Sequence, residues 1–490
     1  MARDLSRRDF LAMAGMTISG AAVRDVRAAR AAPGAEAAGH GALLRFPTGF
    51  LWGAATSAYQ IEGAVHADGR GESIWDRFSH TPGKTLHGDT GDVACDHYHR
   101  YRQDLDLMQH LGLRAYRFSI AWPRVQPAGI GRVNQKGLDF YRRLVDGLLL
   151  RGIHPMATLY HWDLPQALQD RGGWPNREIA KRFAAYTEVV FHALGDTVST
   201  WITINEPWVV ANLGYLSGAL APGIRDPQQA TQATHHLLLG HGLAVQAFRA
   251  LHLQGSEIGI TLNLVPVYPV SGRENDRAAA WAQDGFINRT YLDPIFRGAY
   301  PADVIATNER QGIRFHHVKP GDLRVISTPV DFLGVNYYQP WYVTGTAAHP
   351  QLVSGHHPRT AMGWEIVPAG LHDLLVRLTR DYGHVPIYIT ENGAAFDDKV
   401  NVHGHVDDRA RARFLHDHVV AAHGALRAGV NLKGYEVWSL LDNFEWIAGY
   451  SKRFGIVYVD YPTQRRIPKR SALWYRDVIR RNGVEELLNI

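Results

Sequence analysis

Two glutamates stand where apolar runs of the sequence end. Glu206 directly follows the run Val198–Asn205, and Glu391 ends the run Ile387–Glu391. A carboxyl group at the end of a buried strand must be paired, protonated or functional, because an unpaired buried charge is costly. A salt bridge would explain one such residue. Two at equivalent positions favour a site in which one carboxyl gives up a proton while the other attacks, or activates water.

Aromatic and polar side chains near these glutamates are suited to binding a sugar. A sugar ring has an apolar face that can stack on an indole, and hydroxyl groups at its edge that histidine, asparagine, glutamine and glutamate can bind. Each tryptophan taken alone could equally be a core residue. The candidate platforms are Trp122, Trp162, Trp364, Trp438 and Trp446.

The sequence alternates short apolar runs with helical periodicity. In Tyr101–Leu111 and Phe140–Leu150 the apolar residues recur at three- and four-residue spacing, which is typical of amphipathic helices. Strands that alternate with helices favour parallel β-α units, and eight units predict a single (β/α)8 TIM barrel with long βα loops. The interval 264–330 is the longest and is expected to hold extra helices. The eight predicted strands are Phe50–Thr56, Ala115–Ile120, His154–His161, Val198–Asn205, Glu257–Asn263, Asp331–Tyr337, Ile387–Glu391 and Gly434–Leu440.

This barrel explains why polar residues end the strands. The carboxyl ends of all eight strands meet at one rim, where the catalytic side chains of this fold lie. Glu206 and Glu391 are therefore predicted to face one cavity.

Composition excludes several classes of protein. The chain has 490 residues, of which 46% are apolar and 20% charged, so it can bury a large core. Its single cysteine, Cys95, rules out an intrachain disulfide framework and is expected to be a small buried side chain. Of the net charge of +5, residues 1–32 carry +3 from six arginines and three aspartates. The remainder is nearly balanced, so no nucleic acid partner is predicted.

The N-terminus resembles an export signal. Arg7 and Arg8 precede the weakly apolar run Phe10–Val23, and small-residue cleavage options follow at 29–31 and 35–37. Paired arginines before such a run are typical of the twin-arginine type, and the run is too short to span a bilayer. Residues 1–40 are therefore interpreted as an export signal with a flexible N-terminus, and residues 41–490 as the catalytic domain. The mature protein is expected to be periplasmic or extracellular, without membrane anchoring.

No metal or cofactor is predicted. The abundant histidines lack the spacing of a zinc-binding helix, so they are expected on helix surfaces or in loops. No P-loop and no dinucleotide glycine fingerprint follows a strand, which leaves a nucleotide cofactor without support. The histidines in helical stretches are His235, His236, His241, His416 and His418.

Four blocks of the chain resemble family 1 of the glycoside hydrolases, the β-glucosidase family. They occur in the family's order, and the resemblance extends from about Phe46 to about Tyr475. The blocks are Phe50–Gly63, Thr203–Pro207, Ile389–Gly393 and Trp438–Trp446, the last continuing through Tyr450–Gly455.

The resemblance implies hydrolysis of terminal β-D-glucosyl residues with retention of configuration. By residue matching, Glu206 is the general acid/base and Glu391 the nucleophile. Retention requires carboxyl groups about 5–5.5 Å apart, so that one reaches the anomeric carbon and the other the glycosidic oxygen. The implied substrates are β-glucosides or short β-linked oligosaccharides.

The same matching implies supporting roles. Arg117, Asn336 and Tyr338 would support the nucleophile. The implied substrate-binding residues are Gln60, His161, Trp162, Asn205, Trp364, Trp438, Glu445, Trp446 and Phe454, with Trp438 as a stacking floor and Trp364 as a leaving-group platform.

Several alternatives stay open at this point. β-Galactosidase or β-fucosidase activity is the nearest rival, because these sugars differ from glucose only at O4 or O6. A transglycosidase would use the same residues but transfer the sugar to an alcohol. The sequence also leaves a homo-oligomer open.

Overall fold

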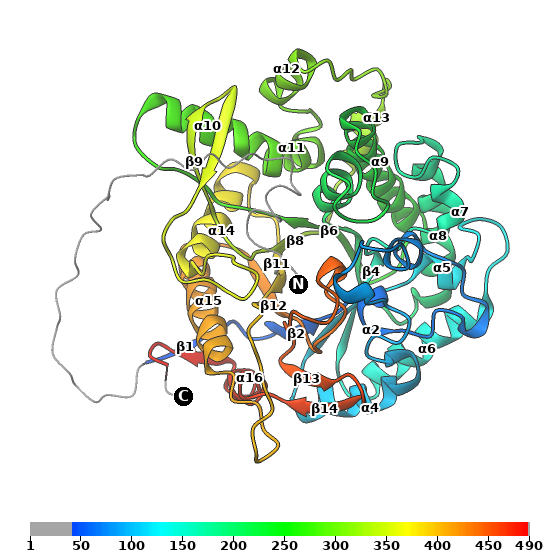
Figure 1. The fold of residues 1–490 in the computed structure, drawn as a ribbon, viewed down its shortest axis with the longest axis vertical. Helices are drawn as coiled ribbons and strands as arrows, with labels where there is room; N and C mark the ends of the chain where they lie inside the picture. The colour runs from blue at the N-terminus through cyan, green and yellow to red at the C-terminus, as the bar shows by residue number, and fades with distance from the viewer. Residues whose placement is uncertain (1–41, 489–490) are drawn as a thin grey trace.

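Eight parallel strands close into a barrel at the centre of the molecule (Figure 1). The computed structural model describes residues 42–488. Going round the barrel, each strand pairs in parallel with the next, and the last pairs with the first. The barrel strands are β2 (Leu51–Ala55), β3 (Ala115–Ser119), β4 (His154–Tyr160), β5 (Thr200–Asn205), β6 (Glu257–Asn263), β8 (Phe332–Asn336), β11 (Ile387–Asn392) and β12 (Leu432–Trp438).

The predicted (β/α)8 barrel is confirmed. All eight predicted runs are strands whose ends agree with the prediction to within two residues. Their near-continuous apolar character follows from burial on both faces, since side chains point alternately into the barrel and towards the helices around it.

Helices surround the barrel and cover its outer face (Figure 1). They bury apolar stripes against the strands, as Leu144 and Leu148 do on the second long helix. The long helices are α4 (His97–His110), α6 (Gln135–Leu149), α8 (Glu178–Leu194), α9 (Pro227–Ala250), α14 (Pro368–Tyr382), α15 (Arg409–Arg427) and α16 (Arg470–Arg481). The two predicted helical stretches fall in α4 and α6.

The long interval after β6 does hold the predicted extra helices. They are α10 (Glu274–Asp284), the π-helical turn η4 (Gly285–Arg289), α11 (Thr290–Arg297), α12 (Ala302–Arg310) and α13 (Asp322–Ile326). Beside them a small sheet pairs β10 (His349–Val353), β9 (Trp341–Thr346) and β7 (Val267–Pro269) in that order.

Shorter elements occupy the remaining loops and the chain ends. The helical ones are α2 (Ala58–Ile61), η1 (Ala67–Gly69), α3 (Ile74–Ser79), η2 (Leu86–Gly88), α5 (Trp122–Val125), α7 (Gln166–Gln169), η3 (Val209–Leu216) and η5 (Trp446–Ala448). The strands are β1 (Leu43–Arg45) paired with β15 (Gly483–Glu485), and β13 (Val457–Asp460) paired with β14 (Arg465–Pro468).

The barrel is a packed core below the rim. A layer of interior side chains near the amino-terminal ends of the strands fills its lower part, so the interior is not a channel. This layer contains Ala115, Met156, Ile202, Phe332 and Tyr388. Cys95 is fully buried, as predicted, and its thiol donates a hydrogen bond to the carbonyl of Asp442 at 3.0 Å.

The prediction that the helical histidines lie on surfaces or in loops is wrong. His235, His236 and His241 on α9, and His416 and His418 on α15, are all buried. Both helices are covered by neighbouring elements, which the local spacing of histidines cannot reveal. Burial lowers the pKa of His241 to about 3, so this ring is neutral. Within residues 42–488, no three or more His, Cys, Asp or Glu side chains form a group that could hold a metal ion.

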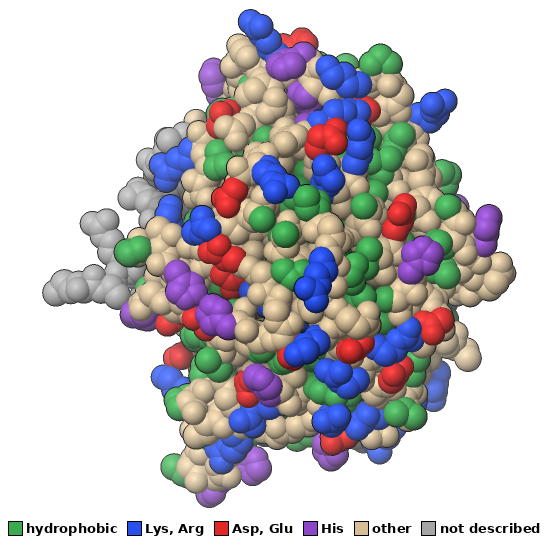
Figure 2. All heavy atoms as spheres, turned by 90° about the vertical axis from the view of Figure 1, so that its right-hand side faces the viewer, with side chains coloured by type: hydrophobic (Ala, Val, Ile, Leu, Met, Phe, Trp, Pro, Cys, Tyr) green, Lys and Arg blue, Asp and Glu red, His purple; other side chains and the backbone are tan. Residues whose placement is uncertain are grey.

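The surface has no region of one charge on the face shown in Figure 2, where acidic and basic side chains are interspersed. The predicted export signal, residues 1–40, lies outside the described residues. Among those described, no helix combines the length and the apolar character needed to cross a membrane.

Candidate active site

A cavity of about 200 Å³ lies at the carboxyl ends of the strands, and it brings most of the predicted site residues together. Both glutamates line it, although they are 185 positions apart in the sequence. The predicted residues that line the cavity are His161, Trp162, Glu206, Asn336, Tyr338, Trp364, Glu391, Trp438, Glu445, Trp446 and Phe454.

Glu206 is aimed into this cavity by an unusual backbone. It directly follows β5, where the pairing with β6 shifts register, and its φ is +50°. This left-handed conformation is costly for a residue other than glycine, and such strain concentrates at functional sites. One carboxyl oxygen, Oε1, accepts a hydrogen bond from Nδ2 of Asn336 at 2.7 Å.

Glu391 is held by two donors, one on each carboxyl oxygen. Nη1 of Arg117 lies 2.6 Å from Oε1, and the hydroxyl of Tyr338 donates to Oε2 at 2.7 Å. A register shift between Ile389 and Glu391 turns this end of β11, as β-bulges do beside many active sites. A cation and a hydroxyl donor both stabilise the ionised carboxylate.

The two glutamates are joined by one hydrogen-bonded network. Nη2 of Arg117 donates to Oδ1 of Asn205 at 2.7 Å, and Asn336 donates to the same oxygen at 3.1 Å. Asn336 therefore contacts Glu206 directly, and it reaches Glu391 through Asn205 and Arg117. All of these side chains are at least 95% buried. The network fixes the relative positions of the two carboxyl groups.

The surroundings place the two carboxyl groups in different protonation states. Burial, followed by the negative charge of Glu391, raises the pKa of Glu206 to about 8. Burial also raises the pKa of Glu391, but the charge of Arg117 opposes that rise. We therefore assign the proton to Glu206 and the negative charge to Glu391. This is the arrangement by which two carboxyl groups serve as acid and nucleophile.

Two of the polar residues predicted to bind sugar hydroxyls, His161 and Glu445, line the cavity, and each is hydrogen-bonded to another predicted residue. Nδ2 of Asn205 donates to Nε2 of His161 at 3.1 Å. His161 then carries its proton on Nδ1, which has no hydrogen-bond partner within the described chain and can donate to a ligand. Glu445 accepts from Gln60 at 3.4 Å, and burial raises its pKa to about 8.

Three predicted residues support the cavity without lining it. Arg117 and Asn205 stand behind the glutamates in the network described above. Gln60 is fully buried and donates to Oδ1 of Asn443, to the carbonyl of Phe444 and to Glu445. Contact of Gln60 and Asn205 with the sugar stays a prediction.

Aromatic rings line the same cavity. The rings of Trp438 and His161 are stacked with centroids 5.8 Å apart, and Trp162 lies 4.6 Å from Trp446. Trp122 is not a platform, contrary to the expectation. It is fully buried and stacks on Tyr186 of α8 in the core.

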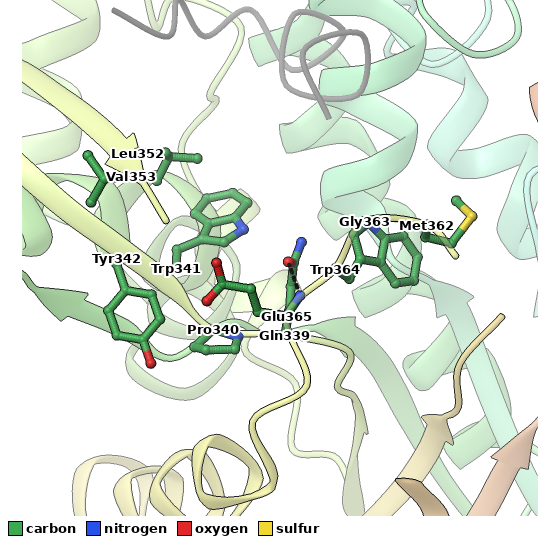
Figure 3. A pocket seen from close by; sticks show the side chains of 10 residues that line it. All are labelled: Gln339, Pro340, Trp341, Tyr342, Leu352, Val353, Met362, Gly363, Trp364 and Glu365. Atoms are coloured by element: carbon green, nitrogen blue, oxygen red, sulfur yellow. Dashed lines mark hydrogen bonds between the residues drawn. The ribbon is translucent and has the colours of Figure 1, made fainter. Parts of the chain in front are cut away.

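Trp364 lines the cavity, and its role as a leaving-group platform stays a prediction. Its ring centroid is 5.0 Å from that of Tyr338 and 5.8 Å from that of Phe454. Figure 3 shows a smaller adjoining pocket whose wall also contains Trp364, together with Gln339 and Trp341 from the loop after β8 and the start of β9.

The sequence interpretation missed many of the apolar residues that line the cavity. Most of these residues come from loops and π-helical segments, where no periodic pattern marks the side chains that face the cavity. Trp208 and Trp341 were the most detectable, since each closely follows a predicted site residue along the chain. The missed lining residues include Trp208, Val209, Leu213, Leu220, Leu264, Val265, Ile287, Gln339, Trp341, Met362 and Lys452.

Comparison with known proteins agrees with this geometry. Residues 43–484 match the family model described as Glycosyl hydrolase family 1. Beta-glucosidase A of Acetivibrio thermocellus is 50% identical over 449 residues, which are 90% of this chain and 99% of that protein. The bifunctional beta-D-glucosidase/beta-D-fucosidase of Bifidobacterium breve is 46% identical and covers 89% of this chain and 98% of its own length.

A solved structure gives the same result in three dimensions. The family 1 β-glucosidase from Thermotoga maritima superimposes with a TM-score of 0.88 at 52% identity, over 91% of this chain and all of that chain. Fold, sequence blocks and the family model therefore agree over nearly the whole described chain. The chain belongs to glycosyl hydrolase family 1.

Proposed function

We propose that the protein is a retaining, exo-acting β-glucosidase that removes terminal β-D-glucosyl residues through a covalent glycosyl-enzyme intermediate. The observation that carries this proposal is the pair of buried carboxyl groups in one cavity with opposite surroundings. Glu391 accepts hydrogen bonds from a guanidinium and a phenol hydroxyl, whereas Glu206 accepts one from an amide. Relatives at about half identity over almost the whole described chain are named beta-glucosidases, which supports the same activity.

In the first step Glu391 attacks the anomeric carbon. The bond from that carbon to the glycosidic oxygen breaks, Glu206 transfers its proton to this oxygen, and the alcohol leaves. An ester now joins the sugar to Glu391, whose negative charge has gone. Because that charge raised the pKa of Glu206, the pKa falls at this stage.

In the second step Glu206, now ionised, takes a proton from water. The water oxygen bonds to the anomeric carbon from the side that the leaving group vacated, and the ester bond to Glu391 breaks. Two inversions restore the original configuration, and Glu206 ends protonated. One residue thus serves as acid and then as base.

The supporting residues act by position and charge. Arg117 and Tyr338 hold Glu391 ionised and oriented for attack. His161, Glu445 and Trp446 bind sugar hydroxyls, and Trp438 stacks on the ring. Exo action is proposed because the polar residues expected to bind the terminal sugar line the same cavity as both glutamates.

The stereochemical course and the sugar preference test this proposal together. Proton NMR of nitrophenyl β-glucoside hydrolysis should show β-glucose first, with the α-anomer appearing only at the rate of mutarotation. Initial formation of the α-anomer would contradict a retaining mechanism. Kinetics on the β-glucoside, β-galactoside, β-fucoside and β-mannoside should give the highest kcat/KM for glucose.

Fucoside hydrolysis is a second candidate activity, favoured by the named dual activity of the Bifidobacterium breve relative. A fucoside preference in the same series would establish it. Added alcohols would reveal transglycosylation as glycoside products formed at the expense of free glucose.

We also propose that the protein is exported by a twin-arginine route. Arg7 and Arg8 before the run Phe10–Val23 support this proposal. Replacing both by lysine should retain the precursor inside the cell, as measured by fractionation and N-terminal sequencing. Arg24→Lys is the matched control and should leave export unchanged. Unchanged export of the double variant would contradict the route.

A further inference from the structure

A second cavity, larger than the catalytic one, lies beside it in the interval after β6. Its volume is about 830 Å³, and its walls come from α9, α10, α11, α12 and the turn between β9 and β10. These elements lie together in the upper part of Figure 1. None of the residues assigned to the catalytic reaction lines this cavity.

Two π-helical segments separate the two cavities and present side chains to both. In η3, Val209 and Leu213 line the catalytic cavity, whereas Asn212 lines the second one. In η4, Ile287 faces the catalytic cavity and Phe286 the second. Single π-helical turns occur preferentially at functional sites.

Two aromatic rings are in contact across the wall between the two cavities. The rings of Trp208, which lines the catalytic cavity, and Phe286, which lines the second, have centroids 5.7 Å apart. The two cavities are therefore neighbours separated by one layer of side chains.

The second cavity contains a polar group with an unmet hydrogen bond. Gln283 on α10 is 5% exposed and lines the cavity, and its Nε2 has no hydrogen-bond partner within residues 42–488. A buried amide donor is costly when it is left unpaired, so its retention favours a ligand that supplies an oxygen acceptor.

The remaining lining indicates the chemistry of that ligand. Aromatic faces alternate with amide and hydroxyl side chains, so the wall suits a molecule with an apolar face and a polar edge. The aromatic members are Trp281, Phe286, Tyr291, Tyr300 and Phe315, and the polar members include Thr231, Thr234, Asn308 and Gln311.

Charge in the wall is compensated, which favours a neutral ligand. Asp303 accepts hydrogen bonds from both Nη1 and Nη2 of Arg289, at 3.0 and 2.6 Å. Burial lowers the pKa of His317 to about 3, so this ring is neutral. Arg310 is exposed at the rim, where water screens its charge.

We propose that this second cavity is a binding site for a neutral saccharide, separate from the catalytic cavity. Gln283 donates to a ring or hydroxyl oxygen, and the aromatic wall packs against the C–H face of the sugar. The site requires no bond to be broken, so it does not depend on the proposed catalytic roles.

Calorimetric titration with cellobiose tests the proposal, using full-length enzyme whose Glu391 is esterified by 2-deoxy-2-fluoroglucose. This block fills the sugar position next to Glu391 but leaves the leaving-group side of the catalytic cavity, lined by Trp364, open, so heat is assigned to the second cavity only where it depends on Gln283. We expect binding with a Kd on the order of 1 mM, which corresponds to about 4 kcal/mol. Gln283→Leu should weaken it about tenfold, because one hydrogen bond to the ligand is lost.

The matched control is Gln109→Leu, at an exposed position on α4, which should leave the Kd unchanged. Each variant should keep the wild-type kcat on nitrophenyl β-glucoside, which verifies the fold. If Gln283→Leu fails that check, Ala306→Trp replaces it, since this exposed lining position admits a large ring that fills part of the cavity.

Absence of heat with the blocked enzyme would overturn the proposal, as would an unchanged Kd in the variants. Binding of 1-naphthol without binding of cellobiose would also overturn it, because the cavity would then select apolar ligands. Failure of the fluoroglucoside to inactivate the enzyme would count against the catalytic proposal alone. Titration of thiocellobiose, which resists hydrolysis, into the unmodified wild type and the unmodified Gln283→Leu variant would then still test the second site, because only binding at that site should be weakened by the substitution.

Discussion

Nη1 of Arg117 lies 2.6 Å from Oε1 of Glu391, and both side chains are buried at the carboxyl-terminal rim of the barrel. β3 supplies the cation and β11 the carboxylate, so the pair exists only because the barrel closes. A buried ion pair is rarely retained for stability, since desolvation of the two ions offsets most of their attraction. Here the charge of Arg117 opposes the rise that burial causes in the pKa of Glu391, the proposed nucleophile.

The first prediction concerns a substitution that removes the cation of Arg117. Arg117→Gln should lower kcat/KM by about 10²–10⁴-fold, because breaking a buried pair costs about 3–5 kcal/mol. Without the cation the pKa of Glu391 rises, so the nucleophile becomes protonated at higher pH. The acid limb of the pH profile should therefore move to higher pH by about 1–2 units. Rates from pH 4 to 9 measure both effects.

The control for this substitution is Arg143→Gln at an exposed position on α6. It should leave both the rate and the acid limb in place. A variant at Arg117 that loses rate without any movement of the acid limb would indicate a purely structural role.

The second prediction concerns the nucleophile. Glu391→Ala should lose at least about 10⁴-fold in kcat, as removal of a nucleophile does in other covalent mechanisms. Azide can enter the vacated space and attack from the same side as the missing carboxylate. Its product should be α-glucosyl azide, identified by NMR. Residual turnover near the wild-type rate would eliminate Glu391 as the nucleophile.

The third prediction separates the acid from the nucleophile by leaving-group dependence. Glu206→Gln keeps the shape of the side chain and its contact distance to Asn336 but removes the proton. Cellobiose, whose leaving group must be protonated, should slow by about 10²–10⁴-fold. Dinitrophenyl β-glucoside, whose leaving group departs unaided, should form the glycosyl ester at nearly the wild-type rate in a burst experiment. Equal losses with both substrates would contradict acid catalysis.

The fourth prediction follows from the raised pKa of Glu206. The acid must be protonated for the first step, so kcat/KM on cellobiose should fall as pH rises through about 8. The same limb should be weaker with dinitrophenyl β-glucoside, which needs no acid. A profile that is flat up to pH 10 with cellobiose would show that Glu206 is not the proton donor.

The fifth prediction concerns the stability of the barrel core. Glu436 on β12 is fully buried, lies across Gly53 of β2, and has no hydrogen-bond partner on either carboxyl oxygen within the described chain. Burial raises its pKa well above the ordinary value. As pH rises above about 4.3, the unfolded chain releases this proton while the folded protein keeps it, so stability falls with increasing pH.

Glu436→Leu should therefore raise the melting temperature by about 2–4 °C at pH 7, with a gain that grows from pH 4 to pH 8. Calorimetric scans at a fixed rate over this range measure the difference from wild type. Glu188→Gln, at an exposed position on α8, is the control and should show no such dependence. A gain independent of pH would mean that the pKa of Glu436 is the same in the folded and unfolded states, which would contradict the prediction.

The sequence was sufficient for the barrel and for the expectation that Glu206 and Glu391 line one cavity. The apolar strands are recognisable because each is buried on both faces, and the polar residues that end them stand out against that pattern. Glu206 and Glu391 could be selected together because parallel strands bring their carboxyl ends to one rim. These are consequences of local pattern and of one topological rule.

Only the tertiary structure determined how the site works and where it extends. The resemblance implied that Arg117 supports Glu391, but the 2.6 Å bond between them depends on the packing of separate strands. The positive φ of Glu206 and the missing partners of Glu436 likewise depend on the surrounding strands, so no local spacing encodes them. The buried histidines of α9 and α15 were misjudged for the same reason, since burial depends on which neighbours cover a helix. The second cavity arises from the packing of loops and short helices. Side-chain contacts across such segments are fixed by shape and close packing, which a one-dimensional pattern does not contain.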